Sequence, residues 1–423
     1  MNTRQPIPFG ESEISIEIPY SRVKIITPPS VFVPNSPNNF VSDAFYNPVG
    51  KINDSIWNPD AVVAVAINDQ TRPLPHAIIL PKLIKFLEQN KIKRENIHFF
   101  IATGTHRQLS TAEIQTILPD GLHEQFYVHC HDCDDRFELQ FLGETHKRTP
   151  VYINKLFFRA DVKIVIGNIE PHHFMGFSGG MKTAAIGLTG RATIEKNHSM
   201  LTDPQAKLGK FFENPMRQDV EEIGRMIGID LALNVVLDHQ NRIIAAFWGE
   251  PYEVMTQGIP VSLEICDAGI AQAECQYDLI IASPGGFPKD INLYQAQKAI
   301  TNACLFSKPG GVIVLMAECR DGVGNQRFLD YLESKQNIQA ILEDFQHKSF
   351  EVGPHKAYQL ALQTADHTII LVSTLDEVLV RKCMLLPAAN LTEALAIAKP
   401  LLPLNPRTAV LPHATHCLPK MNR

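Results

Sequence analysis

The sequence predicts an α/β fold with two domains, each built on a mainly parallel sheet. The chain has 423 residues, which is too long for one ordinary domain. Short apolar or β-branched runs alternate with amphipathic helical stretches, a pattern typical of parallel sheets that are covered on both faces. These runs are residues 61–67, 96–102, 162–168, 277–282 and 311–317.

The best domain boundary lies around residues 262–276, where a helical stretch ends before the run YDLIIA. We therefore expect an N-terminal α/β domain over residues 1–265 and a C-terminal α/β domain over residues 275–423, with the active site in the cleft between them. Residues 28–60 are rich in Pro, Asn and Ser, and we expect them to form an extended, irregular arm.

Composition excludes several classes of protein. Hydrophobic residues make up 45% and charged residues 20%, which is typical of a well-cored globular chain rather than a disordered one. The net charge of -6 offers no basic field for nucleic acid or an anionic membrane. The start lacks an apolar signal core, and no apolar run reaches the roughly 18 residues of a membrane span. The eight cysteines are scattered, as expected of reduced thiols, so we expect a cytoplasmic location.

The residues that could carry chemistry follow the predicted strands directly. Asp69 and Arg72 follow the run at 61–67, and His106 follows the run at 96–102. His172 follows the run at 162–168, and the segment SPGG follows the run at 277–282. Ligands of open α/β sheets bind outside the carboxyl ends of the strands, so these four clusters predict one shared cleft.

The segment EPHHFMGFSGGMK at 170–182 carries the strongest signal. Ser178, Gly179 and Gly180 are small, so their backbone N–H groups can approach a phosphate closely, and Lys182 lies just beyond them. A Walker A motif is excluded, because Met181 and not glycine precedes the lysine. A tight turn with a solvated lysine is the alternative, but it does not account for two histidines, three glycines and a lysine together.

Three histidines are candidates for acid–base or metal chemistry. His106, in GTHR, lies at a strand-to-helix junction, where it can act as a general base or merely be a hydrogen-bonded loop residue. His198, in TIEKNH, is by itself more typical of a capping or packed histidine. Together with His172 and Lys182 it becomes a candidate ligand, since imidazole is a favoured donor to nickel, copper or zinc.

Two further groups suit substrate binding. Arg72 offers a planar fork for a carboxylate, with a structural Arg–Asp pair as the alternative. Tyr294, Gln295 and Lys298 lie on one predicted helix wall, which could equally be a solvated face. The C-x-x-C pair at 130–133 lacks the second pair that a structural zinc site usually needs, so zinc is not favoured there.

Five segments, in this order, resemble the nickel-dependent lactate racemase family. The resemblance covers roughly residues 60 to 300 and extends more weakly over the rest. The segments are NDQTRPLP (68–75), GTHR (104–107), EPHHFMGFSGGMK (170–182), TIEKNH (193–198) and PKDINLYQAQK (288–298).

The resemblance implies a racemase or epimerase of a small 2-hydroxy acid, acting by hydride abstraction and return through a nickel-pincer nucleotide. That cofactor is a pyridinium-3,5-bisthiocarboxylic acid mononucleotide that holds nickel. Lys182 matches the lysine that carries it covalently, and His198 matches the protein ligand of the metal. His106 and His172 match the two acid–base histidines.

The resemblance also implies the remaining site residues and the partners. The cofactor-binding group is Asp69, Ser178, Gly179, Gly180, Gln295 and Lys298. The substrate-binding group is Arg72, Tyr294, Gln295 and Lys298. The partners are the 2-hydroxy acid and the cofactor-biosynthesis enzymes of the host, without nucleic acid or membrane.

Some positions depart from the family pattern. Met181, the segment 185–187 and Tyr358 stand where many relatives have other residues, so the acid could be lactate, malate, another 2-hydroxy acid or a sugar acid. Two other functions stay open. A zinc hydrolase could use the same three histidines, although it leaves Lys182 and the SGG segment unexplained. A non-catalytic cofactor-binding member is the second alternative, against which the retention of both His106 and His172 argues.

Overall fold

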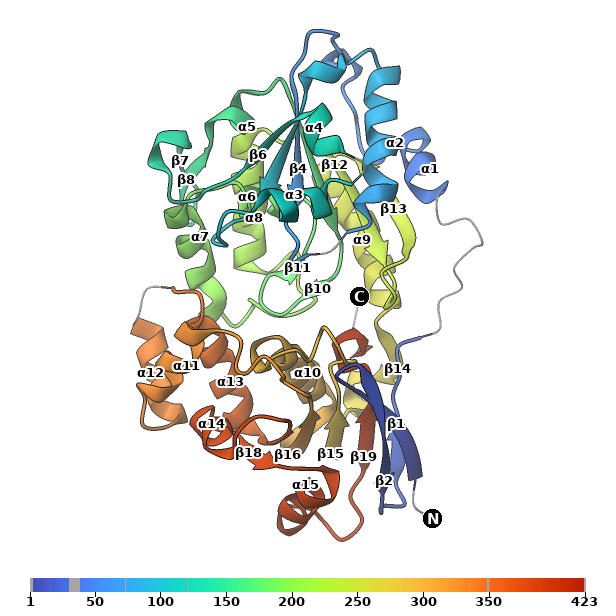
Figure 1. The fold of residues 1–423 in the computed structure, drawn as a ribbon, viewed down its shortest axis with the longest axis vertical. Coiled ribbons are helices and arrows are strands. Elements are labelled where there is room, and N and C mark those ends of the chain that lie inside the picture. The colour runs from blue at the N-terminus through green and yellow to red at the C-terminus, as the bar shows by residue number, and fades with distance from the viewer. Residues whose placement is uncertain (1–2, 30–38, 73, 120, 348–349, 422–423) are drawn as a thin grey trace. The chain divides into compact units, whose positions relative to one another are not determined.

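The computed structural model describes residues 3–29, 39–72, 74–119, 121–347 and 350–421, and it divides the chain into two compact units (Figure 1). The N-terminal unit is residues 31–264, and the C-terminal unit is residues 265–423 together with residues 1–30. Each unit is built on a sheet of mainly parallel strands flanked by helices, so the predicted fold class is confirmed.

The sheet of the N-terminal unit has the strand order β13-β12-β9-β4-β5-β6. Its strands are parallel to their neighbours except β13, which is antiparallel to β12. The apolar runs predicted at 61–67, 96–102 and 162–168 form β4, β5 and β9. The strand bounds are β4 (Val63–Asn68), β5 (Ile97–Ala102), β6 (Tyr127–Cys130), β9 (Val162–Asn168), β12 (Leu231–Leu237) and β13 (Ile243–Gly249).

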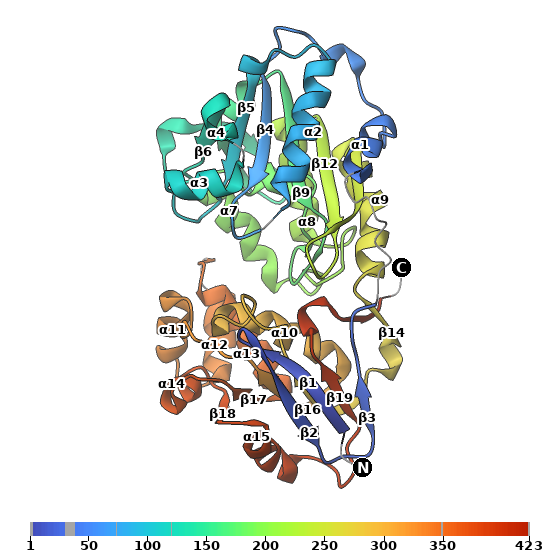
Figure 2. The ribbon, with the colours of Figure 1, turned by 45° about the vertical axis from the view of Figure 1, so that its right-hand side comes forward.

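Helices cover this sheet, and one face forms a large apolar core with α1, α2, α3 and α4 (Figures 1 and 2). The helices of the unit are α1 (Asn39–Tyr46), α2 (His76–Gln89), α3 (Thr111–Ile117), α4 (Leu122–Gln125), α5 (Lys155–Arg159), α6 (Lys182–Ala185), α7 (Arg191–His198), α8 (Pro215–Ile227) and α9 (Pro251–Glu264). Two short antiparallel pairs accompany them, β7 (Leu139–Glu144) with β8 (Pro150–Asn154), and β10 (Pro171–His172) with β11 (Gly176–Phe177).

The expected irregular arm at 28–60 contains a helix, α1, so that expectation was wrong over residues 39–46. Its aromatic side chains explain the difference, because Phe45 stacks on Phe86 with ring centroids 4.4 Å apart and meets the edge of the fully buried Trp248. Burying these rings stabilises a helix that the Pro- and Asn-rich composition does not favour. Residues 30–38 of the arm lie outside the described residues.

The sheet of the C-terminal unit has the order β18-β17-β16-β15-β19-β3, and all of its pairs are parallel. Its strands are β3 (Val23–Ile25), β15 (Tyr277–Ala282), β16 (Ser307–Met316), β17 (Thr368–Val372), β18 (Leu386–Ala388) and β19 (Thr408–Leu411), and smaller pairs join β1 (Thr3–Phe9) to β2 (Ser12–Ile18) and β14 (Asp267–Ala271) to β20 (Leu418–Lys420). Its helices are α10 (Leu293–Phe306), α11 (Gln326–Glu333), α12 (Ile338–His347), α13 (Pro354–Asp366), α14 (Glu377–Lys382) and α15 (Leu391–Ala398).

The first 30 residues differ from the expected domain 1–265, because they join the C-terminal unit. Strand β3 extends the second sheet by pairing with β19, and the β1–β2 hairpin adds Ile7, Ile16 and Ile18 to the core of that sheet. The pairing of β3 with β19 joins segments from opposite ends of the chain, and such a pairing leaves no local sequence pattern. A domain boundary based only on the order of segments along the chain therefore placed residues 1–30 in the wrong unit.

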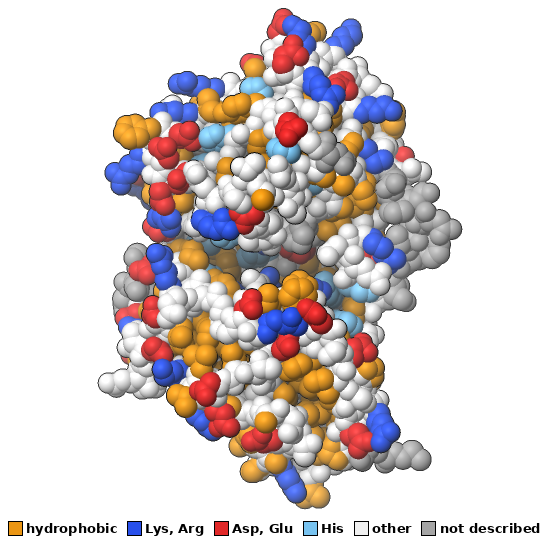
Figure 3. All heavy atoms as spheres, viewed as in Figure 1, with side chains coloured by type: hydrophobic (Ala, Val, Ile, Leu, Met, Phe, Trp, Pro, Cys, Tyr) orange, Lys and Arg blue, Asp and Glu red, His pale blue; other side chains and the backbone are white. Residues whose placement is uncertain are grey.

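The described helices include none with both the length and the apolar character needed to cross a bilayer. On the face drawn in Figure 3, acidic and basic side chains are interspersed, as the small net charge of -6 leads one to expect.

Candidate active site

The strand order of the N-terminal unit reverses between β4 and β9, since β5 and β6 continue on one side and β12 and β13 on the other. Such a switch point is where open α/β sheets bind ligands. Asp69 follows β4, His106 follows β5, and His172 follows β9, so three of the four predicted clusters lie along this edge. The fourth, residues 283–286, follows β15 and belongs to the other sheet.

A short hydrogen bond joins Asp69 to His106, with 2.6 Å between the carboxylate and Nδ1 of the ring. Asp69 is buried, and Thr71 also donates to it from Oγ1 at 2.6 Å. Burial acts to raise the pKa of Asp69, but the bonds from His106 and Thr71 outweigh it, so this pKa lies below its ordinary value. The ionised Asp69 therefore keeps the proton of His106 on Nδ1 and leaves Nε2 as an acceptor.

Arg72 forms an ion pair with Glu170 at 4.0 Å rather than with Asp69. Both side chains are more than a third exposed, so this pair contributes little to stability. The guanidinium also acts electrostatically on His172, Lys182 and His198, lowering the pKa of each. Arg72 therefore lies close to His172, Lys182 and His198, and its ion pair with Glu170 is loose.

His172 has the opposite hydrogen-bond pattern to His106. The backbone N–H of Met175 donates to its Nδ1 at 3.3 Å, which places the ring proton of a neutral imidazole on Nε2. Burial, followed by the charges of Lys182 and Arg72, holds the pKa of His172 well below its ordinary value. The site therefore combines one imidazole whose Nε2 accepts with another whose Nε2 donates.

Lys182 is the first residue of α6 and is 8% exposed. Within the described part of the chain no carboxylate pairs with its ammonium group. Burial, then the positive charges of Arg72 and Arg217, hold the pKa of Lys182 well below its ordinary value, with only Glu170 opposing. A lysine in this setting favours the neutral amine, which is the nucleophilic form.

The loop before Lys182 is closely packed against backbone and side chains. At Gly180, where φ is +59°, a Cβ would lie 2.6 Å from Cγ of Met255, and the backbone N–H donates to Asn234 at 2.6 Å. Gly179, at φ +86°, would place a Cβ 2.6 Å from the same Asn234 oxygen. The hydroxyl of Ser178 is buried and has no partner among the described residues, so this polar atom is available to a ligand.

Two residues that hold this loop were missed by sequence reasoning. Arg217 on α8 is fully buried and donates from Nη1 to the carbonyls of Phe177 and Gly179, both at 3.1 Å. Its ion-pair partner is the equally buried Glu221, at 2.6 Å. A pair at i, i+4 on a polar helix is normally a surface feature, so the sequence offered no signal for it.

His198, the last residue of α7, has its Nδ1 proton committed to the carbonyl of Ile194 at 2.9 Å. Its Nε2 then carries the lone pair that a metal requires. Burial, then the charge of Lys182, lower the pKa of His198 to about 3, so the ring is neutral. Phe174 lies between two of the rings, 4.6 Å from His172 and 5.8 Å from His198 between centroids.

The zinc alternative requires the three histidines to converge on one ion. Their ring nitrogens are not among the described groups of three that lie close enough together to share a metal. One such group consists of Asp132, Cys133 and Asp134. Asp134 is engaged there by Arg191 through two bonds of 2.6 and 2.7 Å, which leaves no reason to place a cation beside it.

The remaining candidates lie on α10 of the C-terminal unit. Asn292 caps this helix by accepting from the N–H of Gln295 at 2.9 Å, which fixes the first turn that carries Tyr294 and Gln295, with Lys298 one turn further on. Burial raises the pKa of Tyr294 to about 12, so its hydroxyl keeps the proton. Lys356, which sequence reasoning did not select, donates to the Tyr294 carbonyl at 3.2 Å.

Two family models match this chain in order. The lactate racemase N-terminal domain matches residues 9–209, and the lactate racemase C-terminal domain matches residues 272–417. The lactate racemase of Thermoanaerobacterium thermosaccharolyticum is 31% identical over 419 residues, or 96% of each chain. The lactate racemase of Lactiplantibacillus plantarum is 30% identical over 307 residues, covering 72% of this chain and 71% of that one.

Solved structures agree with these matches. The lactate racemase apoprotein from T. thermosaccharolyticum superposes with a TM-score of 0.92 at 28% identity, covering 99% of this chain and 100% of that one. A protein from Thermotoga maritima has the same fold, with a TM-score of 0.63 at 17% identity over 92% of this chain and 99% of its own. The chain therefore belongs to the lactate racemase family, a family of isomerases.

Proposed function

We propose that this protein inverts the hydroxyl-bearing carbon of a small 2-hydroxy acid such as lactate, using a nickel-pincer nucleotide attached to Lys182. The observation that carries the proposal is the pair of histidines with opposite hydrogen bonding, in the same unit as the buried Lys182, with which no described carboxylate pairs. His106 donates to Asp69 from Nδ1, while His172 accepts from Met175 at Nδ1. A racemase needs an acid–base group for each enantiomer, and His106 and His172 are the two candidates.

The residues fit the nucleotide. Ser178 offers a buried hydroxyl without a partner among the described residues. Gly179 and Gly180 are required by packing, because a Cβ at either would lie 2.6 Å from Asn234 or Met255, and the N–H groups of Ser178 and Gly180 already donate to Glu170 and Asn234. Lys182 would carry the group through its neutral amine, and His198 would bind nickel through Nε2, with Asp69 nearby. When bound, the cofactor would supply an acceptor and donor for the hydride of the substrate.

The side chains of the chain would do the rest. The α-hydrogen of a 2-hydroxy acid is not acidic, so a base acts on the hydroxyl proton instead. His106 would take that proton through Nε2 from one enantiomer. His172 would serve the other with its ring in the alternative tautomer, in which Nδ1 carries the proton and Nε2 accepts. Arg72 would hold the carboxylate with two parallel donors, which fixes its orientation while the carbon becomes planar. Tyr294, Gln295 and Lys298 remain predicted substrate and cofactor contacts.

The attachment to Lys182 is tested by producing the protein together with the host's cofactor-biosynthesis enzymes. Intact mass and peptide mapping should place an adduct on the Lys182 peptide, with about one nickel per chain by metal analysis. Lys182→Ala should lose the adduct and the racemisation of lactate. An adduct on another residue, or full cofactor-dependent activity in Lys182→Ala, rejects this assignment.

The roles of the histidines separate by readout. His106→Ala and His172→Ala should each lose at least about 10²-fold in turnover while keeping nickel, whereas His198→Ala should lose nickel. If both acid–base variants racemise normally, the two-histidine proposal is wrong. Arg72→Lys keeps the charge but loses the fork, so it should raise KM and lower kcat. Comparison of lactate, malate and longer acids in the same assay identifies the substrate.

A further inference from the structure

Lys356, on α13 of the C-terminal unit, is a buried ammonium group with which no described carboxylate pairs. It is 8% exposed, and its Nζ donates to the carbonyl of Tyr294 at 3.2 Å while lying 5.0 Å from the centroid of the Tyr294 ring. No carboxylate of the described residues forms an ion pair with it. A cation removed from water without a counter-ion is unfavourable, so its retention needs an explanation.

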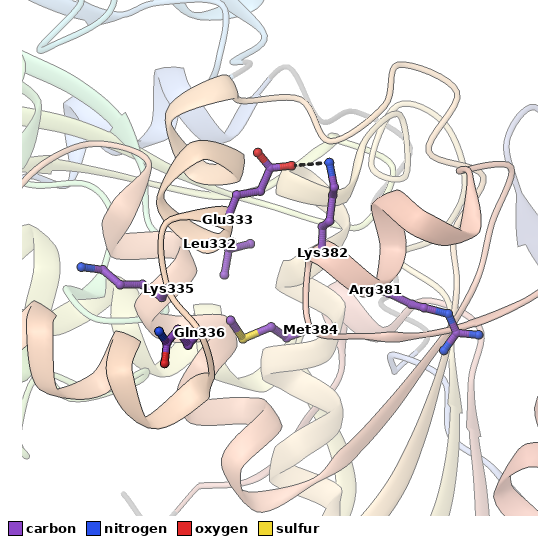
Figure 4. A pocket seen from close by; sticks show the side chains of 7 residues that line it. All are labelled: Leu332, Glu333, Lys335, Gln336, Arg381, Lys382 and Met384. Carbon is purple, nitrogen blue, oxygen red and sulfur yellow. Dashed lines mark ion pairs between the residues drawn. The ribbon is translucent and has the colours of Figure 1, made fainter.

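Other lysines of the same unit show what a structural arrangement looks like. Lys335 lies over the ring of Tyr331 at 5.3 Å, much as Lys356 lies over Tyr294, but it is paired with Asp344 at 2.7 Å. Lys335 lines a surface hollow with a volume of about 320 Å³. Figure 4 shows the residues around this hollow, among them Lys382 and its ion-pair partner Glu333, whose charged atoms are 2.8 Å apart. The two lysines of that hollow are paired with carboxylates, whereas no described carboxylate forms an ion pair with Lys356.

A second positive charge lies close to the first. Burial, then the charge of Lys298 on α10, lower the pKa of Lys356 to about 7. The two helices are tied together, because Gln297 donates to the carbonyl of Lys356 at 2.9 Å and Gln363 donates to Thr301 at 2.6 Å. The helices therefore hold two like charges near each other, and an oxyanion placed against them would relieve both the repulsion and the burial.

We propose that Lys356 is a further anion-binding residue, which together with Lys298 holds an oxyanion on the C-terminal unit. The oxyanion is either the carboxylate of the 2-hydroxy acid or a phosphate of the kind a nucleotide carries. Its identity as substrate or cofactor rests on the proposed function, but the binding itself does not. Lys356 adds to the predicted contacts of Tyr294, Gln295 and Lys298.

Calorimetric titration of the full-length apoprotein tests this. The probes are L-lactate, inorganic phosphate and lactamide, which is the uncharged analogue of lactate. We expect L-lactate or phosphate to bind, and the one that binds identifies the source of the anion; lactamide should not bind. Lys356→Met should weaken binding at least tenfold, while the matched control Lys335→Met should stay within twofold.

Thermal unfolding of the same apoproteins separates binding from a structural role. Lys356→Met removes an uncompensated buried charge but keeps the stem, so the variant should melt above the wild type in the absence of anions. The proposal is overturned if Lys356→Met melts below the wild type or binds the anion as tightly as the wild type does. It is also overturned if the wild type binds lactamide as well as it binds L-lactate, or if it binds neither L-lactate nor phosphate. Failure of the loaded wild type to racemise would instead reject the proposed function, because apoprotein binding requires no turnover.

Discussion

The buried pair of Arg217 and Glu221 allows the sharpest prediction. Both side chains are fully buried, and Arg217 also donates to the carbonyls of Phe177 and Gly179 in the loop before Lys182. Arg217→Met keeps an unbranched stem of similar length but removes the charge and all of these donors. The change therefore leaves one carboxyl and two carbonyls without their partner.

Removing one partner of a buried ion pair typically costs about 3–5 kcal/mol. Burial raises the pKa of Glu221, so in the variant this carboxyl can take up a proton, which limits the cost to about 3 kcal/mol, the lower end of that range. For a unit of this size each kcal/mol lowers the melting temperature by about 2–4 °C, so a fall of roughly 10 °C is expected.

Calorimetry of the apoprotein is the assay, because two units can unfold in separate transitions and only that of residues 31–264 should shift. Glu221→Gln alone should cost a similar amount, since it leaves the arginine charge buried. The double variant Arg217→Met/Glu221→Gln should cost clearly less than the two single changes added together. Strict additivity, or a loss below about 1 kcal/mol in Arg217→Met, refutes the reasoning.

Three other predictions concern single positions. Asp69→Asn should lower racemisation by about 10²–10⁴-fold with nickel retained, because His106 loses the carboxylate that fixes its tautomer; unchanged kcat would contradict this. Gly180→Ala places a Cβ 2.6 Å from Met255 at a residue with φ of +59°. The apoprotein of this variant should melt at a lower temperature and form less adduct on Lys182. A variant with an unchanged melting temperature and a normal amount of adduct would show that the loop can rearrange to accept the methyl group. Burial and the charge of Lys298 lower the pKa of Lys356 from 10.5 to about 7. Between these two pH values Lys356 binds more protons in the unfolded chain than in the folded one. The free energy of unfolding should therefore rise by up to about 5 kcal/mol as the pH rises from 7 to 10.5. Chemical unfolding at several pH values should show the rise in the wild type relative to Lys356→Met; parallel curves would contradict it.

Much of the fold was predictable because buried parallel strands leave a strong local pattern. The runs at 61–67, 96–102 and 162–168 became β4, β5 and β9, and the polar residues after them lie at one edge of a single sheet. Ligands of open α/β sheets bind outside the carboxyl ends of the strands, and applying this rule requires only the positions of the strands along the chain. The rule therefore located Asp69 and His172 without any knowledge of the pairing.

The unpredicted parts depend on contacts between distant segments. Arg217 and Lys356 look like ordinary surface charges, since their burial follows from which helix packs where and not from their neighbours in sequence. Residues 1–30 joined the other unit through β3, whose pairing with β19 spans almost the whole chain. The tautomer of His172 could not be predicted from the sequence either. It depends on the hydrogen bond from the backbone N–H of Met175 to Nδ1 of the ring, and this bond is set by the backbone path between these two residues.

Helix α8 shows why the lysine and the predicted metal ligand can act together. Arg217 fixes the loop that leads into Lys182, as described above. Asp219 lies on the same helix, two positions after Arg217, and is also buried. Its carboxylate accepts a hydrogen bond from the side-chain amide of Asn197 at 2.8 Å, and Asn197 immediately precedes His198. Both candidate cofactor contacts are therefore attached to one rigid element. A tethered group that must also bind a metal tolerates little change in the distance between its two anchors, because misplacement of about 1 Å can cost roughly 10²-fold in rate. The three buried polar residues on α8, Arg217, Asp219 and Glu221, therefore link the loop before Lys182 to the end of α7, where His198 lies.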